Sequence, residues 1–416
     1  MRRANPMFSI LLPSRNRLEL LRHAIASVIA QGDQDIEIIV ADNASSDDYA
    51  SYLSQLSRVT IVYERCDTPI SVTANWNRAL GLADGEYVIM LGDDDALTPN
   101  LLRDLRAIIE RFDRPEVVYM MAYHYAYPGV FPHAPAGYFR SVNNSPLFDM
   151  AKGPFLLEPE VGRRLARKAF RFRHDISFNA QHYVWRRDFM SKNARETGFF
   201  QSPYPDYYAS FVTFFAAERM VVLPSPRVII GISRSSFGFY YANNREQEGA
   251  REFFTEAISE QALSEGDDAI EQALRCPGSP HYRNWLIAVL CATQSLPRSL
   301  GLRVDHRRYR RIQSLELAFQ AGFDKTMSRS VFWQQVGTMD PRDRRFARLM
   351  FWLLVVVERM SVIPRHLVKS MVNSLSRIYH FPSTITYDIG PHETILDAYR
   401  WLETKAGAVT VSTSGE

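Results

Sequence analysis

Short apolar runs alternate with amphipathic segments over the first 125 residues of the chain. Each apolar run has the length of a buried strand, and each amphipathic segment carries apolar residues at helical spacing. The predicted strands lie at 8–12, 36–41, 59–63, 87–91 and 117–121, and the predicted helices at 17–31, 72–83 and 99–111. Strands that alternate with helices in this way predict a parallel, doubly wound α/β sheet with helices on both faces.

The pattern becomes less regular after residue 125. A stretch rich in Pro, Gly and Asn at 126–153 predicts a long loop. The following segments predict a helix at 157–170, a strand at 179–185, a helix that opens near 205, strands within 219–233 and a polar-aromatic loop at 234–249. Helical periodicity dominates from about residue 250. We therefore expect three parts, which are 1–125, 126–249 and a mainly helical region at 250–416.

An apolar run at 349–357 lies between two basic segments. It is shorter than the ~20 residues that a membrane-spanning helix needs. One interpretation is a buried helix of the helical region. The other is a helix that lies in a membrane interface, with contact through residues 342–369 and with Arg and Lys on anionic lipid. The sequence leaves both interpretations open.

The net charge and the cysteines argue against two functions, which are nucleic-acid binding and a structural zinc site. The formal net charge of +3 is too small to indicate a nucleic-acid partner, so we expect none. The three cysteines, Cys66, Cys276 and Cys291, are far apart and form no Cys-x-x-Cys pair. This argues against a structural zinc site and fits a reducing cytosol. The first apolar run predicts a strand and not a signal peptide, so we expect a cytoplasmic protein, associated with the inner face of the cell membrane if 342–369 contacts lipid.

Three consecutive acids, Asp93, Asp94 and Asp95, follow the apolar run at 87–91 after one glycine. Adjacent carboxylates repel each other and gain nothing from burial unless a cation or a set of donors meets them. Ligands bind at the carboxyl ends of strands in open α/β sheets. The triplet therefore indicates a divalent-metal site at a cleft. The alternative is a solvated acidic turn before the helix that Thr98 and Pro99 begin.

Polar clusters also follow the first two strands, at 14–17 and 42–48. Because parallel strands end at the same edge of a sheet, we expect these clusters and the acidic triplet to lie together.

Four segments, taken together and in this order, resemble family-two glycosyltransferases with the GT-A fold. They are Pro-Ser-Arg-Asn-Arg at 13–17, Val-Ala-Asp-Asn-Ala-Ser-Ser-Asp at 40–47, Asn-Trp-Asn-Arg-Ala-Leu at 75–80 and Gly-Asp-Asp-Asp-Ala-Leu-Thr-Pro at 92–99. The resemblance covers roughly the first 240 residues. It implies a GT-A type doubly wound mixed sheet, followed here by the mainly helical C-terminal region. The chain departs from the family pattern at Gly92, where the first acid of Asp-x-Asp is expected, and at Trp76, which replaces an arginine.

The resemblance also implies an activity and roles for individual residues. Family members transfer a sugar with inversion from a nucleotide-diphosphate donor, usually a UDP-sugar, to a hydroxyl of a glycan or a lipid-linked acceptor. It places Asp42 on the base, Asp93 on the ribose, and Asp94, helped by Asp95, on Mn²⁺ or Mg²⁺. The remaining residues that it places near the nucleotide are Pro13, Ser14, Arg15, Arg17, Asn43 and Asn77.

The resemblance implies a catalytic base as well, and Asp206 occupies the expected place after Pro205. It would take the proton of the acceptor hydroxyl. The alternative is an ordinary aspartate at a helix start. A third metal ligand cannot be placed, and the candidates are His174, His182 and His281.

Three competing functions remain to be weighed. A sugar nucleotidyltransferase would carry a Gly-rich phosphate loop after the first strand. In this chain residues 13–17 follow the first strand, and none of them is glycine. A nicotinamide-dependent dehydrogenase would need Gly-x-Gly-x-x-Gly, which the sequence lacks. A non-catalytic interaction module with the same fold is disfavoured by the intact acids.

Overall fold

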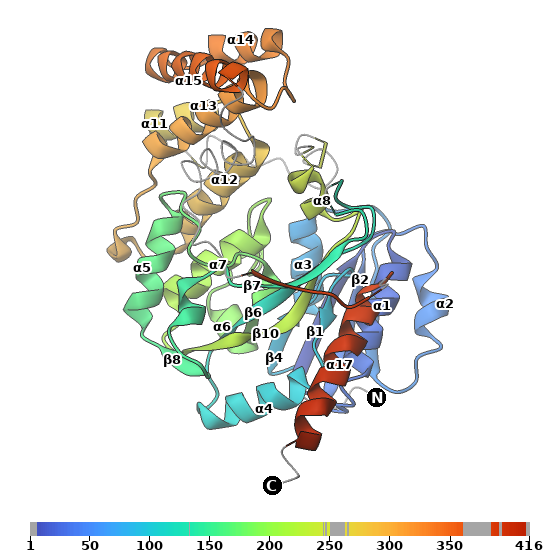
Figure 1. Cartoon of the computed structure of the whole chain (residues 1–416). Coiled ribbons are helices and arrows are strands. Elements are labelled where there is room, and N and C mark those ends of the chain that lie inside the picture. Colours follow the sequence, from blue (N-terminus) through green and yellow to red (C-terminus); the bar gives the residue numbers. More distant parts are fainter. Residues whose placement is uncertain are drawn as a thin grey trace.

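The computed structural model describes residues 6–132, 134–243, 245, 248–249, 263, 266–360, 384–390 and 393–412. Within these residues one large sheet forms the centre of the molecule (Figure 1). Its strands are β1 (Phe8–Ser14), β2 (Ile36–Asp42), β3 (Thr60–Arg65), β4 (Tyr87–Met90), β5 (Ala96–Leu97), β6 (Val117–Ala126), β7 (Tyr138–Val142), β8 (Phe155–Leu157), β9 (Tyr183–Arg186), β10 (Met220–Ile232) and β11 (Thr384–Tyr387).

Helices surround this sheet and form a separate layer at one end of the molecule. Those of the first half are α1 (Leu18–Ile29), α2 (Tyr49–Leu53), α3 (Val72–Gly81), α4 (Leu101–Arg111), α5 (Pro159–Ala169), α6 (Arg187–Lys192), α7 (Pro205–Ala216) and α8 (Phe237–Ala242). Those of the second half are α11 (Asp268–Leu274), α12 (Pro280–Ser295), α13 (His306–Gly322), α14 (Arg329–Gly337), α15 (Pro341–Met360) and α17 (Ile395–Ser412).

The main path of the sheet runs β11-β7-β6-β9-β4-β1-β2-β3, and β10 pairs with β5, β6 and β8 beside it. Strand β1 pairs in parallel with β2 and β4, and β2 pairs in parallel with β3. Strand β9 lies antiparallel between β4 and β6. The sheet is therefore mixed, which confirms the predicted fold class. The predicted long loop at 126–153 contains one more strand, β7, which pairs antiparallel with β6.

Two hydrophobic cores lie on the two faces of the sheet. On one face the apolar stripes of α1 and α4 pack against the strands, with Leu21, Ile25 and Leu105 fully buried. On the other face α3, α5, α6 and α7 cover the sheet, and the same core continues into α12, α13 and α15. The helical C-terminal region is thus joined to the sheet through α7 and α12, which pack together.

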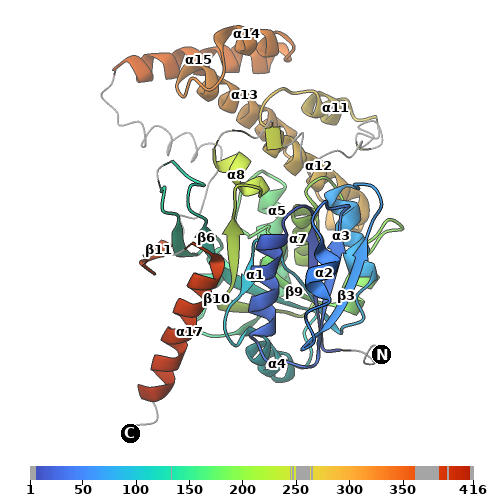
Figure 2. The same cartoon turned by 90° about the vertical axis from the view of Figure 1, so that its right-hand side faces the viewer.

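The last part of the chain returns to the sheet. Strand β11 pairs antiparallel with β7, with Thr384 opposite Val142, and α17 packs against α1 and β5 (Figure 2). Residues 384–390 and 393–405 therefore lie beside the first half of the molecule, although the sequence places them in the helical region. A single short strand with a distant partner leaves no local signal that could reveal this pairing.

Helix α15 contains the apolar run at 349–357 and is covered on one side only. Phe351, Leu354 and Val355 are buried, whereas Trp352 and Val356 are exposed. Residues 361–369, the end of the predicted membrane-contact segment, lie outside the described residues. None of the helices described here is both long enough and apolar enough to span a bilayer.

Candidate active site

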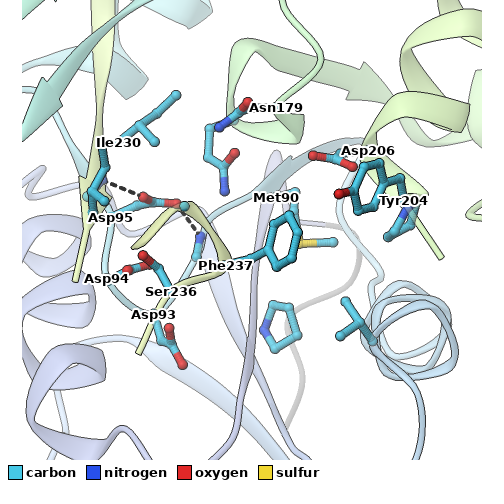
Figure 3. A pocket seen from close by; sticks show the side chains of 18 of the residues that line it. Met90, Asp93, Asp94, Asp95, Asn179, Tyr204, Asp206, Ile230, Ser236 and Phe237 are labelled. Carbon is cyan, nitrogen blue, oxygen red and sulfur yellow. Dashed lines mark hydrogen bonds between the residues drawn. The ribbon is translucent and has the colours of Figure 1, made fainter. Parts of the chain in front are cut away.

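A cavity of about 1240 Å³ opens at the carboxyl ends of β1 and β4. The acidic triplet lines one side, and the start of α7 with Tyr204 and Asp206 lines the other, with Met90 and Phe237 between them in the view of Figure 3. Helix α12 adds His281 and Trp285 to the wall. The predicted convergence of the polar clusters after β1, β2 and β4 is confirmed, because Ser14, Asn43 and Asp93 all line this cavity.

Asp95 holds the turn that carries the triplet. Its Oδ2 accepts from the Gly92 amide at 2.8 Å, and its Oδ1 accepts from the Gly231 amide of β10 at 2.8 Å. Burial, together with the charge of Asp94, raises the pKa of Asp95 well above its usual value. Both oxygens of this carboxylate are therefore engaged with the backbone, and they fix the triplet against β10.

This turn explains why glycine stands at position 92, where the family pattern has an acid. A Cβ built on Gly92 would lie 2.5 Å from Asp95 Oδ2, closer than any van der Waals contact allows. A side chain at 92 would push away the carboxylate that binds the Gly92 amide. The turn therefore leaves no room for an acid at position 92, and the acids begin at Asp93.

Replacing Gly92 by alanine is expected to lower the free energy of unfolding by about 1–3 kcal/mol, because the new methyl group overpacks the turn. Urea denaturation followed by circular dichroism measures this. Gly81→Ala is the matched control, since a Cβ at Gly81 meets nothing within 4 Å. Equal stability of the two variants would contradict the role assigned to the turn.

Asp93 ties the triplet to the first strand. Its Oδ2 accepts from Ser14 Oγ at 2.6 Å, and its Oδ1 pairs with Arg17 Nη1 at 3.0 Å. The Arg17 guanidinium also donates to the carbonyl of Ser235, beyond β10. Ser14 and Arg17, both predicted to lie near a nucleotide, therefore contact an acid of the triplet directly.

Asp94 is the least satisfied of the three acids. Its Oδ2 accepts from Ser233 Oγ at 2.8 Å, and its Oδ1 accepts no hydrogen bond from a described residue. Burial and the neighbouring charge of Asp93 raise the pKa of Asp94 to about 6. The side chain is nevertheless one of those that line the cavity.

The three acids carry more negative charge than their surroundings neutralise. All are buried, with at most 7% exposure, and the one arginine that forms an ion pair with them in the described residues is Arg17. Such a deficit of positive charge, next to a free carboxylate oxygen, fits a hard divalent cation. Among the described residues no group of three or more His, Cys, Asp or Glu side chains is arranged to hold a metal. An ion here would therefore need further oxygen ligands from a substrate or water.

Two residues predicted to contact the nucleotide lie behind the cavity wall. Asp42 is fully buried, and its oxygens accept from the Ser45 amide at 2.8 Å and from Tyr63 Oη at 3.0 Å. Asn77 binds the backbone amide and carbonyl of Phe200. Neither lines the cavity, and their contacts with a nucleotide stay predictions.

The remaining nucleotide-site candidates do reach the cavity. These are Pro13, Ser14, Arg15, Arg17, Asn43 and Asp93. Asn43 is held in place because its amide side chain donates to the Ile70 carbonyl and accepts from the Ile70 amide, both at 2.8 Å.

Asp206 lies in the first turn of α7, just after Pro205. Its Oδ1 accepts from the Tyr207 amide at 2.9 Å, and no ion pair to a described residue balances its charge. Burial raises the pKa of Asp206 to about 7. A carboxylate with this pKa can hold or release a proton near neutral pH, which an ordinary helix-start aspartate cannot.

Two tyrosines of the cavity, Tyr204 and Tyr207, were not predicted from the sequence as site residues. On the side of Asp206, the Tyr207 and Phe178 rings stack at 4.1 Å, and Tyr204 Oη lies 3.3 Å from His281 Nδ1. Burial and the neighbouring His174 lower the pKa of His281 to about 3, so it is neutral. Tyr204 and Tyr207 belong to no recognisable motif, whereas His281 was one of the predicted candidates for a metal ligand.

The histidines considered as metal ligands are placed differently. His174 and His281 line the cavity, whereas His182 does not, because its Nδ1 is engaged by the Met120 carbonyl at 2.7 Å.

Comparison with known proteins identifies the first part of the chain. The model of the family described as "Glycosyl transferase family 2" matches residues 9–187. Residues 9–187 are thus similar to family 2 glycosyl transferases. The match includes β1, β4 and the acidic triplet, and it ends before α7 and Asp206.

Curated relatives match this chain over about a quarter of its length. An Escherichia coli K12 protein, WcaA, named as a colanic acid biosynthesis glycosyl transferase, is 37% identical over 100 residues, which is 24% of this chain and 36% of the relative. A Campylobacter jejuni protein named GalNAc(5)-diNAcBac-PP-undecaprenol beta-1,3-glucosyltransferase is 36% identical over 104 residues, 24% of this chain and 33% of the relative. The chain thus spans about a third of the length of these relatives.

A solved structure of Staphylococcus aureus TarS (residues 1–349) in complex with UDP-GlcNAc is similar over 85% of this chain and 90% of that one. Its sequence identity is 13% and its TM-score is 0.45. We draw no functional conclusion from a similarity at this level.

Proposed function

We propose that the protein is an inverting glycosyltransferase that moves a sugar from a nucleotide-diphosphate donor, probed first as a UDP-sugar, to a hydroxyl of a glycan or lipid-linked acceptor. The similarity to family 2 glycosyl transferases supports this proposal. The observation that carries it is the pairing, within one cavity, of a buried acidic triplet with a lone carboxylate of raised pKa. The triplet suits the binding of the donor, and the lone carboxylate suits the activation of the acceptor hydroxyl.

In this proposal the triplet serves the donor. Asp94 Oδ1 is the oxygen that would hold Mn²⁺ or Mg²⁺, while Asp95 keeps the turn rigid and Asp93, with Ser14 and Arg17, faces the nucleoside. When bound, such an ion supplies positive charge that stabilises a leaving diphosphate. The donor phosphates would provide the ligands that the described side chains do not.

Asp206 serves the acceptor. As the acceptor oxygen forms its bond to the anomeric carbon, its proton passes to a carboxylate oxygen of Asp206, and the bond from that carbon to the diphosphate breaks. Attack from the face opposite the leaving group inverts the configuration. The raised pKa makes Asp206 a stronger base than an exposed aspartate.

The acceptor would bind beside α7 and α12. Tyr207 and Trp285 line this end of the cavity, and aromatic faces of this kind stack against sugars. The relative from Campylobacter jejuni is named for transfer to an undecaprenol-linked acceptor, which supports a lipid-linked acceptor as one of the two classes. Nucleotide sugars and free cysteines both fit a cytoplasmic location.

Product identification separates this function from its alternatives. The purified protein is incubated with Mn²⁺ and a panel of nucleotide sugars, with and without pyrophosphate, and the nucleotides are resolved by chromatography. A glycosyltransferase releases a nucleoside diphosphate, by transfer or by slow hydrolysis. A sugar nucleotidyltransferase would instead consume pyrophosphate and form a nucleoside triphosphate. A non-catalytic module would leave every donor intact.

The pH dependence of kcat/KM should report Asp206. Because the base acts only when ionised, kcat/KM is expected to rise about tenfold per pH unit below about 7 and to level off above it. The measurement is an initial-rate series at constant ionic strength and saturating Mn²⁺. A profile that is flat between about pH 5.5 and 8 would contradict the assignment of this base.

A further inference from the structure

Helix α15 presents a second apolar stripe to solvent, opposite the one that packs on α13. Its residues follow the spacing i, i+3, i+4, i+7 and i+11 and so lie on one face. They are Leu349 (64% exposed), Trp352 (55%), Leu353 (53%), Val356 (50%) and Met360 (63%). Isolated exposed apolar residues are normal on a protein surface, but a continuous stripe along a helix marks an interaction surface.

Helix α14 extends this surface. Trp333 is 36% exposed and lies beside Trp352, with ring centroids 6.5 Å apart. The two helices form the end of the molecule farthest from α4, beyond α12 and α13 (Figures 1 and 2). The sheet and the helices that flank it lie elsewhere in the molecule and leave the stripe exposed.

The exposed charged side chains of α15 are all positive. Arg342, Arg345 and Arg348 are exposed one after another in the first half of α15, and Arg359 is exposed near its end. None of these four forms an ion pair with a described residue. The acids of Pro341–Met360 are turned to other elements, since Asp343 pairs with Arg310 at 2.8 Å and Glu358 with Lys325 at 2.5 Å. The exposed face thus combines apolar side chains with unpaired arginines.

Exposed apolar side chains next to unpaired arginines favour one kind of binding partner. An anionic bilayer surface satisfies both halves of the pattern, because acyl chains take the apolar stripe and headgroups take the arginines. A second copy of the chain, docked face to face, would bring arginines of both copies together without acids between them. We propose that α15, with Trp333, lies in the interface of an anionic membrane as a monotopic helix. This inference does not rest on the proposed function.

Vesicle co-sedimentation of the full chain tests the proposal. The probes are vesicles of phosphatidylcholine and vesicles of an equal mixture of phosphatidylcholine and phosphatidylglycerol. Wild-type protein is expected to sediment with the mixed vesicles and much more weakly with phosphatidylcholine alone. The double variants Trp352→Ser/Leu353→Ser and Arg342→Ser/Arg345→Ser are each expected to lower the partition coefficient about tenfold or more.

The control variant is Leu156→Ser/Ile385→Ser, which removes exposed apolar side chains (48% and 59% exposed) from other surfaces. It is expected to sediment like the wild type. All substituted positions are exposed, so the thermal melts of the variants should overlay and keep the comparison interpretable. Equal sedimentation of the α15 variants and the wild type, or equal binding to both vesicle types, would overturn the proposal.

Analytical ultracentrifugation addresses the competing occupant. The wild type is expected to be no more associated than Trp352→Ser/Leu353→Ser in the absence of lipid. A dimer that this double variant dissociates would show that a second copy covers the stripe, and would overturn the membrane proposal.

Discussion

Asp206→Asn is expected to abolish sugar transfer while leaving donor binding unchanged. The amide has almost the shape of the carboxylate and can still accept from the Tyr207 amide, but it cannot take up a proton. Loss of a positioned general base lowers kcat by about 10²–10⁴-fold. Transfer is measured by nucleoside diphosphate release in the presence of acceptor, and donor affinity by isothermal titration calorimetry. Asp113→Asn is the matched control, because Asp113 is 89% exposed and far from the cavity.

The stability of the same variant gives an independent check. Burial raises the pKa of Asp206 to about 7 in the folded protein, so the folded state binds a proton more tightly than the unfolded chain. The ionised carboxylate therefore destabilises the fold, and its cost grows as pH rises from about 4 to about 7. Asp206→Asn should gain stability over the wild type across this window. Normal turnover of the variant would exclude Asp206 as the base, whatever the stability result.

Asp94→Asn is expected to remove metal-dependent donor binding. Asp94 Oδ1 is the free, buried carboxylate oxygen of the triplet, and an amide oxygen without charge binds Mn²⁺ much more weakly. The measurement is calorimetric titration of the protein with a UDP-sugar in the presence of Mn²⁺. The affinity of the variant for the donor should fall to the value that the wild type shows when EDTA removes the metal. Since the pKa of Asp94 is about 6, proton competition should also weaken metal binding by the wild type as pH falls through that value.

The control for this experiment is again Asp113→Asn, with a folded-state check by circular dichroism. Donor affinity that is unchanged in Asp94→Asn and insensitive to EDTA would contradict a metal held by the triplet. It would leave the acids as a turn that only supports β10.

The alternation of strands and helices was sufficient to predict the parallel part of the sheet. Apolar runs buried on both faces, such as β1 and β4, are visible in the sequence because nearly every residue in them must be apolar. The acidic triplet was equally visible, since three adjacent acids after a buried strand need an explanation. These features depend on residues that are neighbours in the sequence, so they can be recognised without the structure.

Features that depend on distant partners could not be predicted. The partners of Asp42 are one example, because nothing local in the sequence shows that its oxygens accept from Ser45 and Tyr63. Trp285 reaches the cavity only because α12 packs on α7. In α15, apolar residues on all sides allowed two interpretations, and only the packing on α13 shows which face is covered.

The most direct test of the central claim is a crystal structure of the protein soaked with Mn²⁺ and UDP, with anomalous diffraction used to locate the ion. The proposed function predicts that Asp94 Oδ1 would hold the Mn²⁺ ion next to the bound diphosphate, with Asp206 facing the space beyond the phosphates. Strong density for UDP elsewhere, or an ion that leaves Asp94 untouched, would contradict it.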